Sequence, residues 1–576
     1  MRIVHPILVL FADQAFFALA KIKPFAIQEQ AIPNVINGFC NIGGAPPEAH
    51  LDNATFTGIC EGGAARFLGI PYAEPPTGDR RLRLPDPLPP YEGNYDARKF
   101  GPSCPQQRML LPRGLNTRLE KDVSDIFAKL YEKITVDNED CLTINVFTPE
   151  DATNTSNLPV VVWIFGGGFE IGGTALYDGA VIVTRSIKMG EPIIFVSMNY
   201  RICLAAFGFL PGKEVKNAKI GNLGLQDQRL ALKWVQKYIS AFGGDPSKVT
   251  IWGESAGAIS VALHMLVNKG DQEGLFRGAI MQSGGPIPVG DIENGQQYYD
   301  ALVKNAACDN SPDTLECLRN VPYAKFKYAM DLSPNFFAYQ GLALAWLPRV
   351  DGIFLTEPPQ YAVLRGHVSN VPMITGMNAH FIVGNCDDEG SLFSLSSLNV
   401  TTTTELGQYL NSFMLPTAPK NQVDLLLQYY PEDVTAGCPF DTGPLNNLSV
   451  QYKRIAAIQG DIVFHGPRRL LLKYQANKQN SWAFVHKRGK FLPFIGAAHG
   501  TDLLDSFGGG KLADYVIYFT RNLDPNGDLE EISWPQYDLR DPKALIFQEF
   551  GLVVEDDNYR IDPLEFVANL SLLHPI

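Results

Sequence analysis

Short apolar runs without alternation recur through the middle of the chain and set its pattern. They are VVVWIF (160–165), IIFVSMNY (193–200), VTIW (249–252), AIMQS (279–283), MITG (373–376) and WAFVH (482–486). Such runs are typical of strands that are buried on both faces. Helical patterns lie between them, for example LALKWVQKYISAF (230–242). Strands that alternate with helices predict the α/β class, with a large central, mostly parallel sheet flanked by helices.

The N-terminus carries a different pattern. Residues 1–20, MRIVHPILVLFADQAFFALA, have an early arginine, an apolar stretch and Ala-Leu-Ala before a cleavage point after Ala20. This predicts a signal peptide; Asp13 and Gln14 interrupt the apolar stretch and keep a disordered N-terminus as the alternative. We expect a leader over 21–45 and a single α/β domain over 46–576, which begins with a small N-terminal sheet. No run of about 18 or more apolar residues occurs, so no transmembrane segment is predicted.

Net charge and cysteine content limit which partners and which compartment we expect for this protein. The 48 basic and 61 acidic residues leave a net charge of −13, which argues against nucleic acid or an anionic membrane as the main partner. Nine cysteines favour an oxidising compartment, and we expect a secreted protein. Five N-x-[ST] sequons predict glycosylation at Asn53, Asn154, Asn399, Asn447 and Asn569.

One serine stands between two glycines directly after a predicted strand. In VTIWGESAGA (249–258), Ser255 lies two residues from Gly253 and two from Gly257, and a helical pattern follows. A strand, a sharp turn and a helix are what a nucleophilic serine requires, and the flanking glycines leave room for its strained backbone. We interpret Ser255 as a nucleophile; the alternative is a structural strand-to-helix turn.

A second glycine-rich segment, FGGGF (165–169), directly follows the first strong predicted strand. Backbone N–H groups can point into a site where side chains are absent. We therefore expect Gly167 and Gly168 to donate to an oxyanion, with Ala256 as a third donor. The alternative is a flexible glycine turn.

A serine nucleophile needs a base and an orienting acid, and in α/β hydrolases both follow the serine in the chain. His499, in IGAAHGTDLL, lies in a loop of small residues after the last strong strand and is the predicted base. For three other histidines a structural role is the better interpretation: His264 in a predicted helix, His486 at the end of a predicted strand, and His465. For the acid, GNCDDEGSLF offers Asp387, Asp388 and Glu389, and their spacing does not choose among them.

These residues resemble the type-B carboxylesterases, and among them the fungal lipases similar to that of Candida rugosa. FGGDPSKVTIWGESAG (242–257) looks like the serine pattern of this family, and EDCLTINVFTP (139–149) looks like its second pattern. GNLGLQDQRLALKWVQKYI, PRVDG (348–352) and AAHG (497–500) match as well. The resemblance runs from about residue 50 to the C-terminus. It implies the α/β-hydrolase fold, and it assigns the acid to Glu389.

The resemblance also implies two disulfides, a lid and part of an acyl pocket. The disulfides would join Cys104 to Cys141 and Cys308 to Cys317. The lid would span about 104–141, and its apolar stripe consists of Leu119, Val123, Ile126, Phe127, Leu130, Tyr131 and Ile134. Leu392 and Phe393 fall where the lipases line the acyl pocket.

Five cysteines remain after these pairings, and two segments depart from the family pattern. The remaining cysteines are Cys40, Cys60, Cys203, Cys386 and Cys438. Their number is odd, so at least one should be free, and Cys40 with Cys60 is one candidate disulfide. MNAHFIV (377–383) and the pair at 202–203 look inserted. We expect deletion of 377–383 to leave a better folded enzyme.

The sequence thus predicts a serine hydrolase that cleaves carboxylic esters through an acyl-enzyme and needs no metal or organic cofactor. Long-chain acylglycerols or sterol esters, met at a lipid–water interface, are the favoured substrates. A short-chain, soluble-ester carboxylesterase is the alternative, and a noncatalytic binding glycoprotein is a further one. The oligomeric state stays open between a monomer and a lid-mediated dimer.

Overall fold

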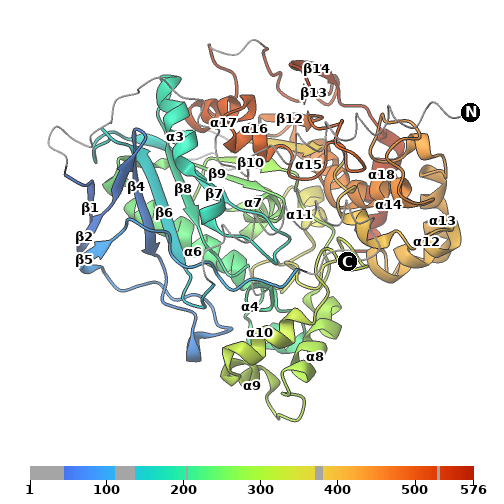
Figure 1. The fold of residues 1–576 in the computed structure, drawn as a ribbon, viewed down its shortest axis with the longest axis horizontal. Coiled ribbons are helices and arrows are strands. Elements are labelled where there is room, and N and C mark those ends of the chain that lie inside the picture. Colours follow the sequence, from blue (N-terminus) through green and yellow to red (C-terminus); the bar gives the residue numbers. More distant parts are fainter. Residues whose placement is uncertain (1–44, 110–136, 203–204, 370–379, 529–531) are drawn as a thin grey trace, which may run out of the picture.

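A sheet of eleven strands runs through the part of the chain that the structure describes (Figure 1). This structure is a computed structural model, and it describes residues 45–109, 137–202, 205–369, 380–528 and 532–576. From one edge to the other the strands are β14 (Leu552–Asp556), β13 (Lys543–Phe547), β12 (Ser481–His486), β11 (His380–Cys386), β10 (Gly278–Gln282), β9 (Gly244–Glu254), β7 (Leu158–Ile164), β8 (Ile194–Met198), β6 (Thr143–Pro149), β4 (Ala64–Pro71) and β3 (Ile59–Glu61).

The middle of this sheet is parallel and its edges are antiparallel. Every neighbouring pair from β8 through β13 is parallel, whereas β6, β4 and β3 at one end and β14 at the other run antiparallel to their neighbours. A separate small sheet contains β1 (Glu48–Leu51), β2 (Asn53–Thr57) and β5 (Glu92–Asp96). The predicted fold class, a large and mostly parallel sheet with a small N-terminal sheet, is confirmed.

Helices cover both faces of the large sheet. Trp252 of β9 stacks on Phe507 on one face. The next residue, Gly253, faces the opposite way, and a Cβ there would lie 2.4 Å from the backbone of Gly257 in the helix on the other face. The described helices are α3 (Gly179–Lys188), α4 (Ala205–Phe209), α5 (Lys213–Ala218), α6 (Leu223–Tyr238), α7 (Ala256–Leu266), α8 (Gln296–Asn305), α9 (Thr314–Asn320), α10 (Tyr323–Asp331), α11 (Pro359–Arg365), α12 (Thr403–Tyr409), α13 (Lys420–Tyr429), α14 (Tyr452–Gly460), α15 (Gly466–Gln475), α16 (Leu503–Phe507), α17 (Lys511–Asn522) and α18 (Ile561–Leu573).

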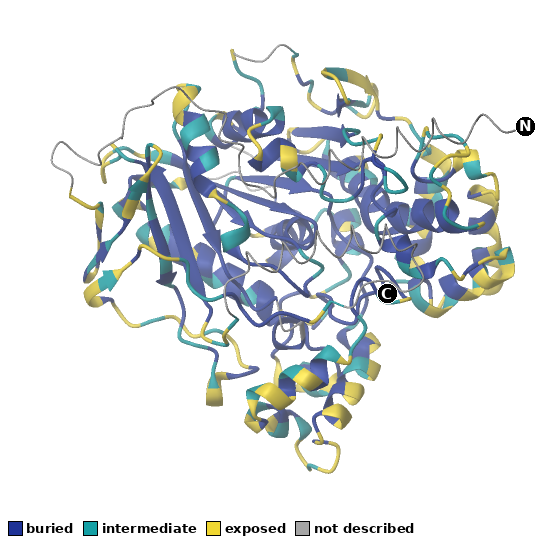
Figure 2. Cartoon of the chain, viewed as in Figure 1, coloured by how far each residue is buried: buried dark blue, intermediate teal, exposed yellow. Residues whose placement is uncertain are grey.

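The unalternating runs of the sequence are the buried central strands. Every residue of β8, β10 and β12 is buried, and so are all residues of β7 after Leu158. Figure 2 shows this buried centre, with exposed residues concentrated on the outer helices and connecting loops. Two-sided burial explains why the strands lack a polar face.

One central strand was not predicted. The strand between β10 and β12 is β11, which pairs in parallel with both, and the predicted strand MITG (373–376) lies outside the described residues. Residues Phe381, Ile382 and Val383 of β11 are fully buried and belong to the segment that looked inserted. The structure speaks against the expectation that deletion of 377–383 would improve folding, since the deletion removes four of the seven residues of β11. Ile202 is likewise fully buried rather than surplus, and Cys203 lies outside the described residues.

Several predictions concern residues that the structure does not describe. The signal peptide, nearly all of the leader and the whole apolar stripe of the lid fall within 1–44 and 110–136. Among the described residues, no helix combines the length and apolar character needed to cross a membrane.

Candidate active site

Ser255 occupies the single residue between β9 and α7. Its backbone has φ 55° and ψ −124°, a conformation that costs free energy for a residue with a side chain. The glycines on either side are required by close packing: a Cβ on Gly257 would lie 1.9 Å from the carbonyl oxygen of Ile164, and one on Gly253 would meet α7. The turn therefore has the sharp strand-to-helix geometry that the sequence pattern predicts.

The structure brings the three predicted triad residues into one hydrogen-bonded series. His499 Nε2 lies 2.7 Å from Ser255 Oγ, and His499 Nδ1 lies 2.6 Å from Glu389 Oε2. The other carboxylate oxygen of Glu389 accepts a hydrogen bond of 2.8 Å from the backbone N–H of Cys386. With Nδ1 protonated and bonded to Glu389, Nε2 is free to accept the serine proton.

The alternative acids and bases lie elsewhere. Asp387 and Asp388 both pair with the ammonium group of Lys490 rather than with a histidine. His486 contacts Asp505 at 2.6 Å, and His465 contacts Tyr559 at 2.9 Å. The geometry thus distinguishes Glu389 from its two neighbours, which spacing alone could not do.

The glycine segment lies beside the serine. Gly167 and Gly168 have φ values of 111° and 65°, and a Cβ on Gly167 would lie 1.9 Å from the carbonyl oxygen of Ile171. Both glycines line the same cavity as Ser255, and so does Ala256. Within the described residues, no hydrogen bond engages the N–H of Gly167 or Gly168, so these donors are available to a ligand.

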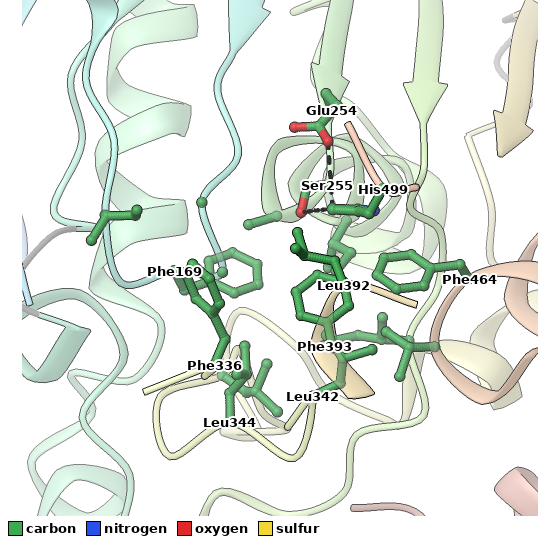
Figure 3. Close-up of a pocket in the computed structure, with 18 of the residues that line it drawn as sticks. Phe169, Glu254, Ser255, Phe336, Leu342, Leu344, Leu392, Phe393, Phe464 and His499 are labelled. Carbon is green, nitrogen blue, oxygen red and sulfur yellow. Dashed lines mark hydrogen bonds and ion pairs between the residues drawn. The ribbon is translucent and has the colours of Figure 1, made fainter. Parts of the chain in front are cut away.

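A cavity of about 210 Å³ opens beside Ser255 and His499 (Figure 3). Leu392 and Phe393 line it, as expected for the acyl pocket, and the ring centroid of Phe393 lies 5.2 Å from that of His499. Most of the other lining side chains are apolar: they include Phe336, Leu342, Leu344, Leu347, Val463 and Phe464. An apolar wall with a reactive hydroxyl at its end suits an acyl chain attached to an ester.

Glu254 is a site residue that the sequence reasoning missed. Its Oε1 lies 3.4 Å from His499 Nε2, on the side of the imidazole that faces the serine. Burial raises the pKa of Glu254 to about 8, although the charge of His499 opposes this. Its position directly before Ser255 in the motif was the available signal, because a side chain there must lie at the same end of β9.

The carboxyl groups around His499 change its basicity. Burial alone would lower the pKa of the imidazole, but Glu389, Glu254 and Asp502 outweigh it and raise the pKa to about 9. Asp502 is itself fully buried, and burial raises its pKa. The site thus stabilises an imidazolium, the ion that forms when His499 takes a proton from serine.

The aromatic and aliphatic loop over the cavity was also missed. Phe336 and the segment 342–347 show neither a helical nor a strand period, so no local pattern marks them as lining residues. Their position depends on tertiary contacts: the backbone N–H of Phe336 donates to the buried carboxylate of Glu170, which directly follows the glycine segment.

The cysteines behave largely as expected. Cys60 is disulfide-bonded, which the Cys40–Cys60 pairing requires, although Cys40 lies outside the described residues. Cys386 and Cys438 are free and buried. The structure contains both predicted disulfides, Cys104–Cys141 and Cys308–Cys317.

All five sequon asparagines are exposed on the surface: Asn53, Asn154, Asn399, Asn447 and Asn569. Exposure is what a glycan requires, so each asparagine stays a candidate for glycosylation.

A serine presented by a strained turn at the carboxyl end of a parallel strand, in reach of a histidine from a later loop, is the arrangement of α/β hydrolases. The fold of a solved structure agrees: EstA of Aspergillus niger matches with a TM-score of 0.76 and 27% identity, over 92% of this chain and 99% of that one.

The sequence comparisons agree with this class. Residues 52–554 match the model of the Carboxylesterase family. The chain belongs to the carboxylesterase family, and it is a carboxylic ester hydrolase.

Its relatives include fungal lipases. The secreted triacylglycerol lipase LIP1 of Gibberella zeae is 41% identical over 539 residues, which cover 90% of this chain and 89% of that protein. Lipase 4 of Diutina rugosa is 40% identical over 549 residues, which cover 91% of this chain and 96% of that protein.

Proposed function

We propose that this enzyme hydrolyses long-chain acylglycerols or sterol esters by way of an acyl-enzyme. The observation that carries the proposal is the apolar cavity that begins at Ser255 Oγ and is walled by Leu392, Phe393 and the loop with Leu342 and Leu344. An acyl chain in this cavity would bury apolar surface, at about 25 cal/mol per Å² removed from water. The names of the relatives, which act on triacylglycerols or are called lipases, support acylglycerols first.

The proposed chemistry starts at the serine. Ser255 Oγ attacks the ester carbonyl carbon while His499 Nε2, at 2.7 Å, takes the hydroxyl proton. Glu389 holds the imidazole by its Nδ1–H and stabilises the resulting imidazolium. The same proton then passes to the leaving alcohol oxygen as the carbon–oxygen bond breaks.

The second half of the cycle repeats these steps with water. The N–H groups of Gly167, Gly168 and Ala256 would donate to the oxyanion of each tetrahedral intermediate. Water attacks the acyl-enzyme, His499 accepts its proton, and that proton returns to Ser255 as the carboxylic acid leaves. All groups named here come from this chain.

We also propose that the protein is secreted. The two disulfides, the five exposed sequon asparagines and the relatives named as secreted lipases support an extracellular location. Treatment with an N-glycosidase should lower the mass of protein made in a eukaryotic secretory host. No mass shift at any of the five sites would remove the glycan part of this argument.

The test of the substrate is the initial hydrolysis rate on emulsified triolein relative to dissolved tributyrin, with Ser255→Ala as the blank. A high ratio supports a long-chain lipase, and sterol esters are then compared with triolein. Hydrolysis of tributyrin with negligible hydrolysis of triolein would overturn the long-chain proposal in favour of a soluble-ester carboxylesterase. Absence of hydrolysis on every ester would favour the noncatalytic glycoprotein.

A further inference from the structure

The proposed acid and base come from two loops that are 110 residues apart, so some contact must hold the loops together. One such contact is made by the backbone of Asp388, the residue next to Glu389. Its N–H donates to the carbonyl oxygen of Ala497 at 3.0 Å, two residues before His499. Asp388 also forms an isolated parallel bridge with Ala498. A short piece of sheet therefore joins the acid loop to the base loop.

The carboxylate of Asp388 strengthens this junction. Its Oδ2 accepts a hydrogen bond of 2.8 Å from the backbone N–H of Ala497, and its Oδ1 accepts one of 2.8 Å from the N–H of Phe440. The side chain is fully buried. One carboxylate thus ties the base loop and a third segment to the acid loop.

The base loop is shaped around that carboxylate. A Cβ on Gly496 would lie 2.3 Å from Asp388 Oδ2, and Gly496 has a φ of 60°. Only glycine allows the chain to pass so close to the buried carboxylate and still turn towards His499.

The positive charge of Lys490 offsets the repulsion between the buried carboxylates of Asp387 and Asp388. Its ammonium group lies 2.8 Å from both oxygens of Asp388, 2.5 Å from Asp387, and 3.0 Å from the carbonyl oxygen of Phe440. Burial and the neighbouring Asp387 raise the pKa of Asp388, and Lys490 opposes both effects. Without a cation, two adjacent buried carboxylates would repel each other.

We propose that Asp388 and Lys490 are positioning residues that set the distance between Glu389 and the imidazole of His499. The inference rests on the proposed function, because it assigns these two residues to the support of the proposed triad. Neither touches the serine or lies in the cavity, so they act through the two loops.

The main test compares Lys490→Met with Lys490→Arg and with a matched control. Lys473→Met is the control, because Lys473 also pairs with an acid, Glu565, but on the surface of α15. Active sites are counted by stoichiometric labelling with a fluorophosphonate, and kcat and KM are then measured per active site on p-nitrophenyl butyrate.

If loss of Lys490 displaces the imidazole, Lys490→Met should lose about 10- to 100-fold in kcat per active site, and its KM should stay within about twofold of the wild-type value. Lys490→Arg should recover most of the loss, and Lys473→Met should match the wild type. An unchanged kcat per active site in Lys490→Met would overturn the proposal, even if its thermal midpoint falls, because that is the result of a merely structural role.

A second measurement does not depend on turnover. In the wild type, the proton between His499 Nδ1 and Glu389 should give a low-field ¹H NMR signal, which a His499→Gln sample identifies. Asp388→Asn, which removes the charge but little volume, should shift or lose this signal. An unchanged signal in Asp388→Asn would overturn the role of Asp388. This test remains possible even if Lys490→Met fails to fold. Failure of the proposed function would give a different result from failure of this inference, since Ser255→Ala would then still hydrolyse the ester.

Discussion

The two halves of the proposed triad are held in place by different kinds of interaction. The serine half consists of the turn between β9 and α7, where glycine backbone packs against backbone and Ser255 adopts φ 55°. The acid–base half consists of two distant loops joined by a buried carboxylate and an ammonium group. Steric exclusion fixes the first half, by contacts of glycine backbone within the turn and with the end of β7. Electrostatic contacts among segments far apart in sequence fix the second, which should make it more sensitive to charge and pH.

The largest effect should come from removal of the nucleophile. Ser255→Ala should lower kcat on p-nitrophenyl butyrate by about 10⁴- to 10⁶-fold, since the acyl-enzyme can no longer form. The fold should persist, because alanine fits wherever the serine methylene fits, and circular dichroism checks this. Hydrolysis at the wild-type rate by purified mutant would remove Ser255 from the mechanism.

The next largest effect should follow loss of the orienting charge. Glu389→Gln keeps the size of the side chain but removes the carboxylate that lies 2.6 Å from His499 Nδ1. We expect kcat to fall by about 10²- to 10⁴-fold at neutral pH, with a smaller change in KM. A fall of less than about tenfold would assign the orienting role to another of the buried carboxyl groups near His499.

The steric half can be tested by one added methyl group. Gly257→Ala places a Cβ 1.9 Å from the carbonyl oxygen of Ile164 and should lower the free energy of unfolding by about 3 kcal/mol. The control is Gly407→Ala in α12, where the nearest atom would be at an ordinary 3.6 Å. The control should gain about 0.5–1 kcal/mol, because alanine favours the helix over glycine. Equal urea midpoints for the two variants would contradict the steric account.

The smallest effect concerns pH. The imidazole must be neutral to accept the serine proton, and nearby carboxylates raise the pKa of His499. Activity should therefore be lost as pH falls through a midpoint above the value of about 6.5 for free imidazole. Glu254→Gln removes one of these carboxylates, at 3.4 Å, so this midpoint in kcat/KM should move to lower pH. An unchanged midpoint would mean that Glu254 is neutral throughout and does not raise the pKa of His499.

Local patterns were sufficient for the serine half of the site and for most of the central strands. The elbow at Ser255 and the glycines at 167 and 168 follow from steric rules that act over a few residues. The acid could not be chosen from spacing, because Asp387, Asp388 and Glu389 all stand in the same loop. Only the approach of the His499 loop separates the one that faces the imidazole from the two that face Lys490.

The sequence by itself determined the α/β class, the order of strands and helices, the turn that presents Ser255 and the positions of the cysteines, because periodicity and glycine placement are local properties. Tertiary structure alone decided that residues 380–386 form the strand between β10 and β12, since no local pattern had marked this run as a strand. It also decided the role of Glu254 and the wall of the cavity. Both depend on contacts between residues that are far apart in the sequence, and no local pattern predicts such contacts.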